Sequence, residues 1–159
     1  MPDPSDRCPS VPRGRFDANG DGCVGPYRRI DVLLRGAWVV LRRGIRIGTE
    51  TASRVPGGAT VRLRCASCKV RQKLRARRSR ITLTKLSGKL IRRGKSFSVR
   101  VTAPGHIGQV KTLTVKRYGK SRRARNRIST NPFKTVNRCI PIGARRPARR
   151  CDATPPRGP

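Results

Sequence analysis

ATVRLRCASC, residues 59–68, is the stretch that decides the fold of this chain. Its first seven residues alternate strictly between apolar and polar side chains. A period of two is typical of a β-strand with one buried face. Gly57 and Gly58 precede the stretch and supply the turn from which such a strand begins. The alternating stretch therefore predicts a half-buried strand in which Arg62 and Arg64 face outward.

The same alternation recurs on both sides of this strand, over residues 27–118. Residues 28–41 read as one strand that is bent or bulged at Gly36. Further apolar sets with this spacing are Ile45 and Ile47, Val70 and Leu74, Ile81 and Leu83, Phe97, Val99 and Val101, and Leu113 and Val115. Turn signals separate them at Arg42-Arg43-Gly44, Gly88, Arg93-Gly94, Pro104-Gly105 and Gly108. Short strands with glycine punctuation predict an all-β domain, a small immunoglobulin-like β-sandwich.

The charge of the chain is strongly positive and unevenly distributed. Lys and Arg number 40 against 7 acids, which gives a net charge of +33 and a pI near 12.0. The first 27 residues hold four aspartates against three arginines, a net charge of −1, so the remainder carries +34. We expect an acidic, cation-binding segment (1–26), a basic body (27–118) and a basic, partly disordered tail (119–159). A body of this charge makes polyanions, nucleic acid included, the first partners to consider.

The six cysteines fall into three local pairs. They are Cys8 with Cys23, Cys65 with Cys68, and Cys139 with Cys151. An even count in local pairs favours a disulfide framework and therefore an oxidising compartment. The first ten residues have no signal-peptide pattern, and the longest apolar run, residues 37–41, is far too short to span a membrane. The chain is thus either cytoplasmic or, as we expect, the mature or truncated part of an extracellular or cell-envelope protein.

Two pieces of the first segment suggest a calcium loop. DANGDGC, residues 17–23, has the form D-x-N-x-D-G, in which alternate side-chain oxygens converge on calcium. Ahead of it, DPSDRCP, residues 3–9, has the form D-x-x-D-x-C-P. Together they resemble the thrombospondin type 3 repeat, which implies Ca²⁺ as a cofactor. The ligands would be Asp17, Asn19 and Asp21, with Asp3 and Asp6. The residues after Gly22 supply none of the later acids of that repeat, and the alternative is an Asx-rich turn without metal.

The body resembles a module found in secreted actinobacterial proteins. The matching residues are VPGGATVRLRC (55–65) with Cys68, LIRRGKSFSVRVTAPGHIGQ (90–109), and CIPIG (139–143) with Cys151. The resemblance covers most of residues 30–151, in patterns of strands and turns. It implies an extracellular β-module without an assigned activity.

The tail begins with a basic run that has almost nothing to bury. We interpret this run either as a solvated, disordered segment or as an anion-binding arm. In the second case the polyanion-binding residues are Arg122, Arg123, Arg125 and Arg127. Residues 131–142 offer Phe133, Val136 and Ile140 for docking on the sandwich, and Cys139 and Cys151 close a loop behind them. The proline-rich end, residues 154–159, reads as an unstructured terminus or a linker.

Catalytic chemistry finds little support in the sequence. The Cys65-x-x-Cys68 pair could join His106 and Cys139 or Cys151 in a zinc site, or form a redox pair, but it follows a strand and not a helix N-terminus. A structural disulfide is the simpler reading. His106 is the only histidine and lies in a glycine-rich turn, and a general base needs an orienting partner. We expect a non-enzymatic protein.

The outward cations suggest a partner class. Arg62, Arg64, Arg71, Lys73, Arg75 and Arg100 alternate with core residues. The few aromatics, with Trp38 and Phe97 assigned to the core, leave no platform on which bases could stack, so contact with nucleic acid would be mainly to phosphate. The leading hypothesis is an extracellular structural or adhesive module that holds an anionic cell-wall polymer or glycan. The alternative is a cytoplasmic, sequence-independent nucleic-acid-binding protein.

Overall fold

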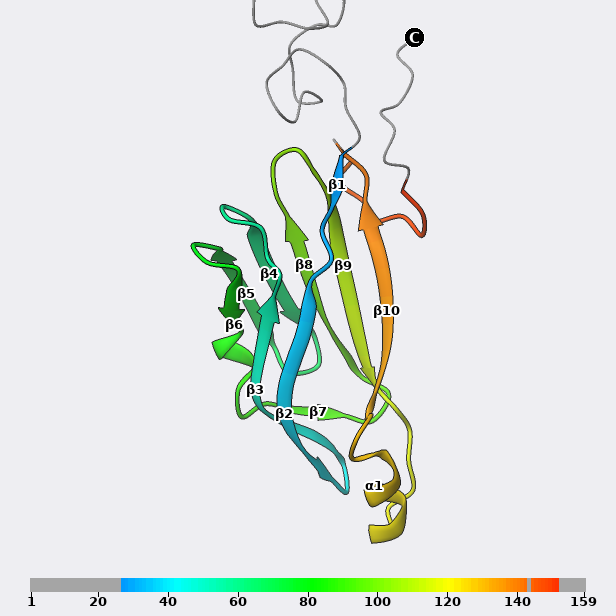
Figure 1. Ribbon diagram of the computed structural model, residues 1–159. Coiled ribbons are helices and arrows are strands. Elements are labelled where there is room, and N and C mark those ends of the chain that lie inside the picture. Colours follow the sequence, from blue (N-terminus) through cyan, green and yellow to red (C-terminus); the bar gives the residue numbers. More distant parts are fainter. Residues whose placement is uncertain (1–26, 143, 152–159) are drawn as a thin grey trace, which may run out of the picture.

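The computed structural model describes residues 27–142 and 144–151, which fold mostly into β-strands (Figure 1). The elements in chain order are β1 (Arg28–Arg29), β2 (Leu33–Leu41), β3 (Gly44–Ser53), β4 (Thr60–Cys65), β5 (Val70–Arg75), β6 (Arg80–Thr82), a 3-10 helix (Thr84–Leu86), β7 (Leu90–Arg92), β8 (Ser96–Thr102), β9 (His106–Val115), α1 (Arg122–Ile128) and β10 (Phe133–Ile140). The expected calcium ligands Asp3, Asp6, Asp17, Asn19 and Asp21 lie outside the described residues, as do Cys8 and Cys23.

The strands form two sheets. The larger has the order β1-β9-β8-β4-β5, with β10 also paired to β9, and the smaller has the order β2-β3-β6, with β7 also paired to β3. Pairing is antiparallel except between β1 and β9. The predicted β class is confirmed at this level.

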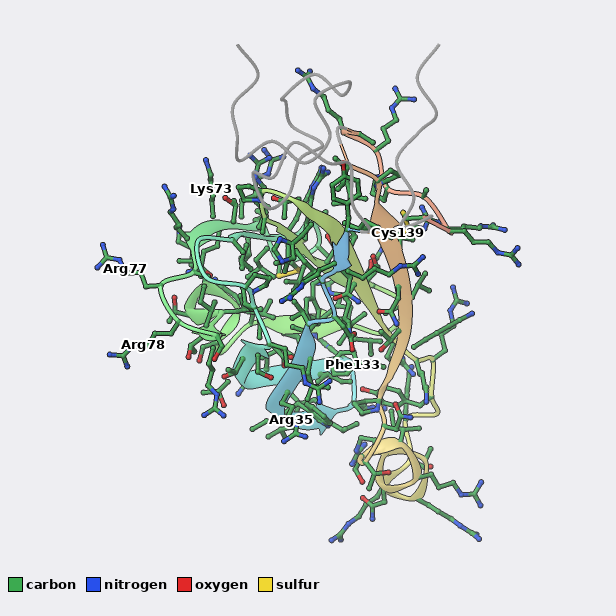
Figure 2. All side chains as sticks on the ribbon, turned by 45° about the horizontal axis from the view of Figure 1, so that its top comes forward. Arg35, Lys73, Arg77, Arg78, Phe133 and Cys139 are labelled. Atoms are coloured by element: carbon green, nitrogen blue, oxygen red, sulfur yellow. A yellow bond between two sulfur atoms is a disulfide. The ribbon has the colours of Figure 1, made fainter. Side chains whose placement is uncertain are left out.

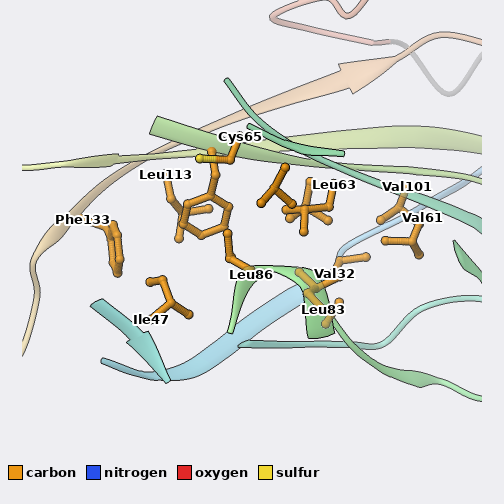
Figure 3. Close-up of a cluster of buried hydrophobic side chains, with 14 of the residues drawn as sticks. Val32, Ile47, Val61, Leu63, Cys65, Leu83, Leu86, Val101, Leu113 and Phe133 are labelled. Atoms are coloured by element: carbon orange, nitrogen blue, oxygen red, sulfur yellow. The ribbon is translucent and has the colours of Figure 1, made fainter. Parts of the chain in front are cut away.

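One apolar core lies between the sheets (Figure 3). The larger sheet contributes Val61, Leu63, Phe97, Val99 and Val101, and the smaller contributes Ile45, Ile47 and Ile91. Leu83 and Leu86, at the 3-10 helix, are fully buried with them. Burial of each such side chain is worth about 1.5–3 kcal/mol, so this shared core holds the sheets together.

The stretch that opened the sequence analysis behaves as expected. Strand β4 pairs with β8 on one side and β5 on the other. Val61, Leu63 and Cys65 are buried, whereas Arg62 and Arg64 are exposed. The residues of β4 therefore supply both a strip of the core and a strip of cationic surface.

The expected single strand over residues 28–41 is in fact two strands of different sheets. Strand β1 pairs in parallel with β9, and β2 pairs with β3 in the other sheet. Ile30 and Val32 are buried where the chain crosses over, and the Val32 amide donates to Oε1 of Gln109 over 2.7 Å. Alternation continues through the crossover because the segment keeps one side toward the core.

The irregularity expected at Gly36 occurs elsewhere. Ala37 pairs with Thr49 and Trp38 with Ile47, so the unpaired residue is Gly48 of β3. Gly36 is needed for another reason, because a Cβ at that position would collide with the carboxyl group of Glu50. A glycine inside a strand can mark the close approach of another group as well as a bulge.

The segment expected as a partly disordered tail contains a helix and a strand. Residues 122–128 form α1. Ser121 caps its N-terminus, because the Ser121 Oγ accepts from the Ala124 amide. Strand β10 then pairs with β9 over all eight of its residues, from Phe133 opposite Val115 to Ile140 opposite Gly108. The larger sheet thus extends past the expected domain boundary at residue 118.

Two of the three expected disulfides are present in the described part of the chain. Cys65 bonds to Cys68, with Cα atoms 5.5 Å apart, and Cys139 bonds to Cys151, with Cα atoms 6.0 Å apart. The second bond fastens the segment after β10, which also pairs with that strand through Cys139 and Ala148.

Candidate polyanion-binding surface

The outer face of the larger sheet carries cations in rows that run across the strands. Lys73 of β5, Arg62 of β4 and Arg100 of β8 lie directly opposite one another in successive strand pairs. The next row has Arg71 opposite Arg64. We call the residues Arg62, Arg64, Arg71, Lys73 and Arg100 the sheet-face cations.

The spacing of these cations follows from sheet geometry. Neighbouring strands lie about 4.8 Å apart, and residues two apart on one strand are about 7 Å apart, so adjacent positive charges are close in both directions. Like charges directly opposite each other destabilise a sheet by a few tenths of a kcal/mol to about 1 kcal/mol per pair. This face of the sheet therefore carries unfavourable repulsion between like charges.

Acidic partners do not relieve it within the described residues. The acids there are Asp31 and Glu50. Asp31 faces Arg54 over 3.7 Å with both side chains exposed, and Glu50 is 3% exposed inside the protein. Neither belongs to the strands that carry the sheet-face cations. Figure 2 shows that Lys73, Arg77, Arg78 and Arg35 extend away from the ribbon.

The four arginines expected to bind polyanions lie on α1 and divide into two groups. Arg122, Arg123 and Arg127 are exposed and line one hollow of about 660 Å³ together with Asn126. Arg125 is half-buried and donates to the carbonyl oxygen of Lys120 over 2.6 Å. The helix thus gathers three of the four on one surface.

Helix α1 is attached to the sheets and does not stand free. Trp38 Nε1 donates to the Ser129 carbonyl oxygen over 2.9 Å, and Ile128 packs against the core. The rings of Trp38 and Phe97 each meet Phe133 edge-on, with centroids 5.5 and 5.9 Å away. These aromatic side chains serve the core, as expected, and the cationic surfaces consist mainly of guanidinium and ammonium groups.

A second arginine cluster was not anticipated. Arg43, Arg92, Arg93 and Arg117 together line a pocket of about 610 Å³. The sequence contains its signal, because Arg-Arg-Gly occurs twice, at residues 42–44 and 92–94. Taken alone, each Arg-Arg-Gly copy predicts only a turn. The two copies lie together in the structure because Gly44 of β3 pairs with Arg92 of β7.

The residues weighed for metal or redox chemistry are otherwise engaged. Cys65, Cys68, Cys139 and Cys151 are disulfide-bonded, and no group of three or more metal-ligating side chains gathers within residues 27–142 and 144–151. His106 Nδ1 lies 2.8 Å from the Pro104 carbonyl oxygen, which can only accept, so this nitrogen carries the proton.

Comparison with models of protein families, with curated proteins and with solved structures finds no match to this chain. Its function has to be argued from its own residues. In the part of the chain described here, no helix has the length and apolar character needed to cross a membrane.

Proposed function

We propose that this chain is a non-enzymatic module of the extracellular space or cell envelope that holds an anionic cell-wall polymer or glycan. In this proposal the two sheets are an immunoglobulin-like β-sandwich and serve as a rigid support. The sheet-face cations contact the polymer, and Arg122, Arg123, Arg125 and Arg127 of α1 add to its retention.

The observation that carries the proposal is the cross-strand register of Lys73, Arg62 and Arg100. Scattered surface arginines would keep a protein soluble without facing one another. Three cations in one row cost folding free energy, and a bound polyanion would turn that cost into affinity. Arg100 also donates to the Arg145 carbonyl oxygen over 2.9 Å, so its guanidinium is held on this face.

Nucleic acid is the second candidate, because the same cations would neutralise phosphates. Large exposed aromatics for base stacking are missing from the described residues: Tyr27, Phe97, Tyr118 and Phe133 are each less than 10% exposed, and Trp38 is partly buried. Binding would then be insensitive to sequence and would weaken steeply with salt.

The test measures retention of the full chain on three immobilised polymers, namely poly(glycerol phosphate), a sulfated glycan and duplex DNA, over a range of NaCl concentrations. The variant R62Q/K73Q removes one opposed pair of the sheet face. R77Q/R78Q is the matched control, since it removes two charges from exposed positions between β5 and β6.

We expect R62Q/K73Q to bind poly(glycerol phosphate) or the sulfated glycan at least about tenfold more weakly and the control to change affinity by less than about twofold. R62Q/K73Q should also unfold at higher urea concentration, because its opposed charges are gone. Equal losses in both variants would show that net charge alone acts and would remove the sheet face from the proposal. Tighter binding to duplex DNA than to the other two polymers would favour the nucleic-acid candidate.

The proposal includes a bound Ca²⁺ ion, for which the support comes from the sequence alone. The D-x-N-x-D-G pattern at Asp17, Asn19 and Asp21, with Asp3 and Asp6, supports a Ca²⁺ site in the first segment. An acidic segment that takes up calcium beside a cationic body is compatible with a wall-associated module.

A further inference from the structure

The pocket between the two Arg-Arg-Gly turns has no role in the proposed function. The residues that line it come from the β2–β3 turn, the β7–β8 turn and the chain after β9. These three segments lie at the end of the molecule that carries α1 (Figure 1). Arg43, Arg92, Arg93 and Arg117 line it, and we call them the end-pocket arginines. Four guanidinium groups line this one hollow, which makes it a strongly positive site.

Backbone hydrogen bonds lock the three segments together. The Arg93 amide donates to the Arg43 carbonyl oxygen over 3.3 Å, and the Gly94 amide donates to that of Val115 over 2.8 Å. Gly94 has φ of 76°, which favours glycine, and the space beside it is occupied by the Arg117 side chain. The turn at Gly94 therefore brings Arg93 and Arg117 to the same pocket.

Tyr118 contacts two of the turns that form the pocket. Its hydroxyl lies 2.6 Å from the Leu41 carbonyl oxygen and 2.7 Å from that of Gly44, so it ties down the turn that carries Arg43. Arg93 donates to the Tyr118 carbonyl oxygen, and its guanidinium lies over the Tyr118 ring at 5.4 Å from the centroid. A guanidinium fixed in this way loses little conformational freedom when it binds an anion.

We propose that the end-pocket arginines bind a compact, multiply charged phosphate group. Planar guanidinium forks match phosphate oxygens two at a time, and a cluster carrying four positive charges is best balanced by linked phosphates. A volume of about 610 Å³ is within the range of small-molecule sites and exceeds what a single phosphate needs. The ligand is either free condensed phosphate or a polymer end that carries linked phosphates. This inference does not depend on the proposed function of the sheet face.

The test is isothermal titration of the full chain with inorganic tripolyphosphate, inorganic phosphate and citrate at fixed NaCl. R43A/R117A removes two exposed pocket arginines whose side chains donate no hydrogen bond to residues 27–142 or 144–151. R77A/R78A removes the same charge elsewhere. We expect one tripolyphosphate per chain, binding weakened at least about tenfold in R43A/R117A and by less than about twofold in R77A/R78A.

A polymer end as ligand is distinguished by a short poly(glycerol phosphate) with and without a terminal diphosphate. Preference for the form with the diphosphate that R43A/R117A abolishes assigns the polymer end as ligand, and equal affinity for both forms assigns free condensed phosphate. Absence of one-to-one tripolyphosphate binding, citrate binding as tight as tripolyphosphate, or equal losses in both variants would overturn the inference. R62Q/K73Q should leave tripolyphosphate affinity unchanged, so failure here and failure of the proposed polymer site are seen separately.

Discussion

Glu50 of β3 is a charged residue type that the fold buries. It points inward from β3, is 3% exposed, and lies over Gly36 of the neighbouring strand. Burial raises the pKa of Glu50 from 4.5 to about 7. Below about pH 7 the folded protein therefore holds Glu50 mainly in its protonated form.

This pKa predicts that the protein loses stability as pH rises. The folded state binds the Glu50 proton more tightly than the unfolded state, so stability is highest below pH 4.5 and falls until about pH 7. The shift corresponds to about 3 kcal/mol. E50Q should remove most of this dependence and raise stability at neutral pH. Urea unfolding of both proteins from pH 4 to pH 8 checks this, and equal pH slopes would contradict it.

At the scale of elements, the Cys139–Cys151 disulfide fastens the end of the larger sheet. Cys151 is buried with Tyr27 and Ile107 in a small cluster separate from the main core, and Arg29 donates to its carbonyl oxygen. The bond closes a loop with a sequence separation of 12. In the chain-entropy model a loop of this length is worth about 3 kcal/mol.

We expect C139S/C151S to lower the free energy of unfolding by about 3 kcal/mol while keeping the fold. Amide exchange should accelerate most at the end of β10, near Ile140, and in residues 144–150. Because the core contacts of β4 and β8 are unchanged, their amides should lose no more protection than the fall in global stability requires. Hydrogen exchange read by mass spectrometry measures this. A loss of protection in β4 and β8 greater than the fall in global stability would contradict a local role.

For the molecule as a whole, the redox state of the cysteines separates the two candidate compartments. Three disulfides belong to an oxidising environment, and six thiols belong to the cytoplasm. We expect protein from its native source to take up no alkylating reagent under denaturing, non-reducing conditions, as read by intact mass. Two alkylated thiols would contradict the pairing of Cys8 with Cys23, and six would remove the extracellular proposal.

The net charge of +33 is also a property of the whole molecule. A charge of this size makes some binding to any polyanion unavoidable at low salt. The matched double variants at Arg77 and Arg78 address this point, because they separate the arrangement of charges from their number.

Local chemistry made part of this structure predictable. Alternation of apolar and polar side chains is set by strand geometry, so Val61, Leu63 and Phe97 could be assigned to the core and Arg62 and Arg64 to the surface. Cysteines three or twelve residues apart are held close by the chain itself, so Cys65–Cys68 and Cys139–Cys151 were also within reach.

Strand partners were decided only in three dimensions, because hydrogen bonds between strands join residues that the sequence separates widely. The sequence offered no sign that residues 28–41 divide between two sheets or that residues 133–140 pair with β9. The sequence suggested a bulge at Gly36, whereas in the structure Gly36 leaves room for the carboxyl group of Glu50. The sequence by itself determined that this protein is a cationic, disulfide-bonded β protein with arginines facing outward. The tertiary structure decided which arginines face one another, because the sheet-face rows and the pocket between the two Arg-Arg-Gly turns exist only through long-range strand pairing.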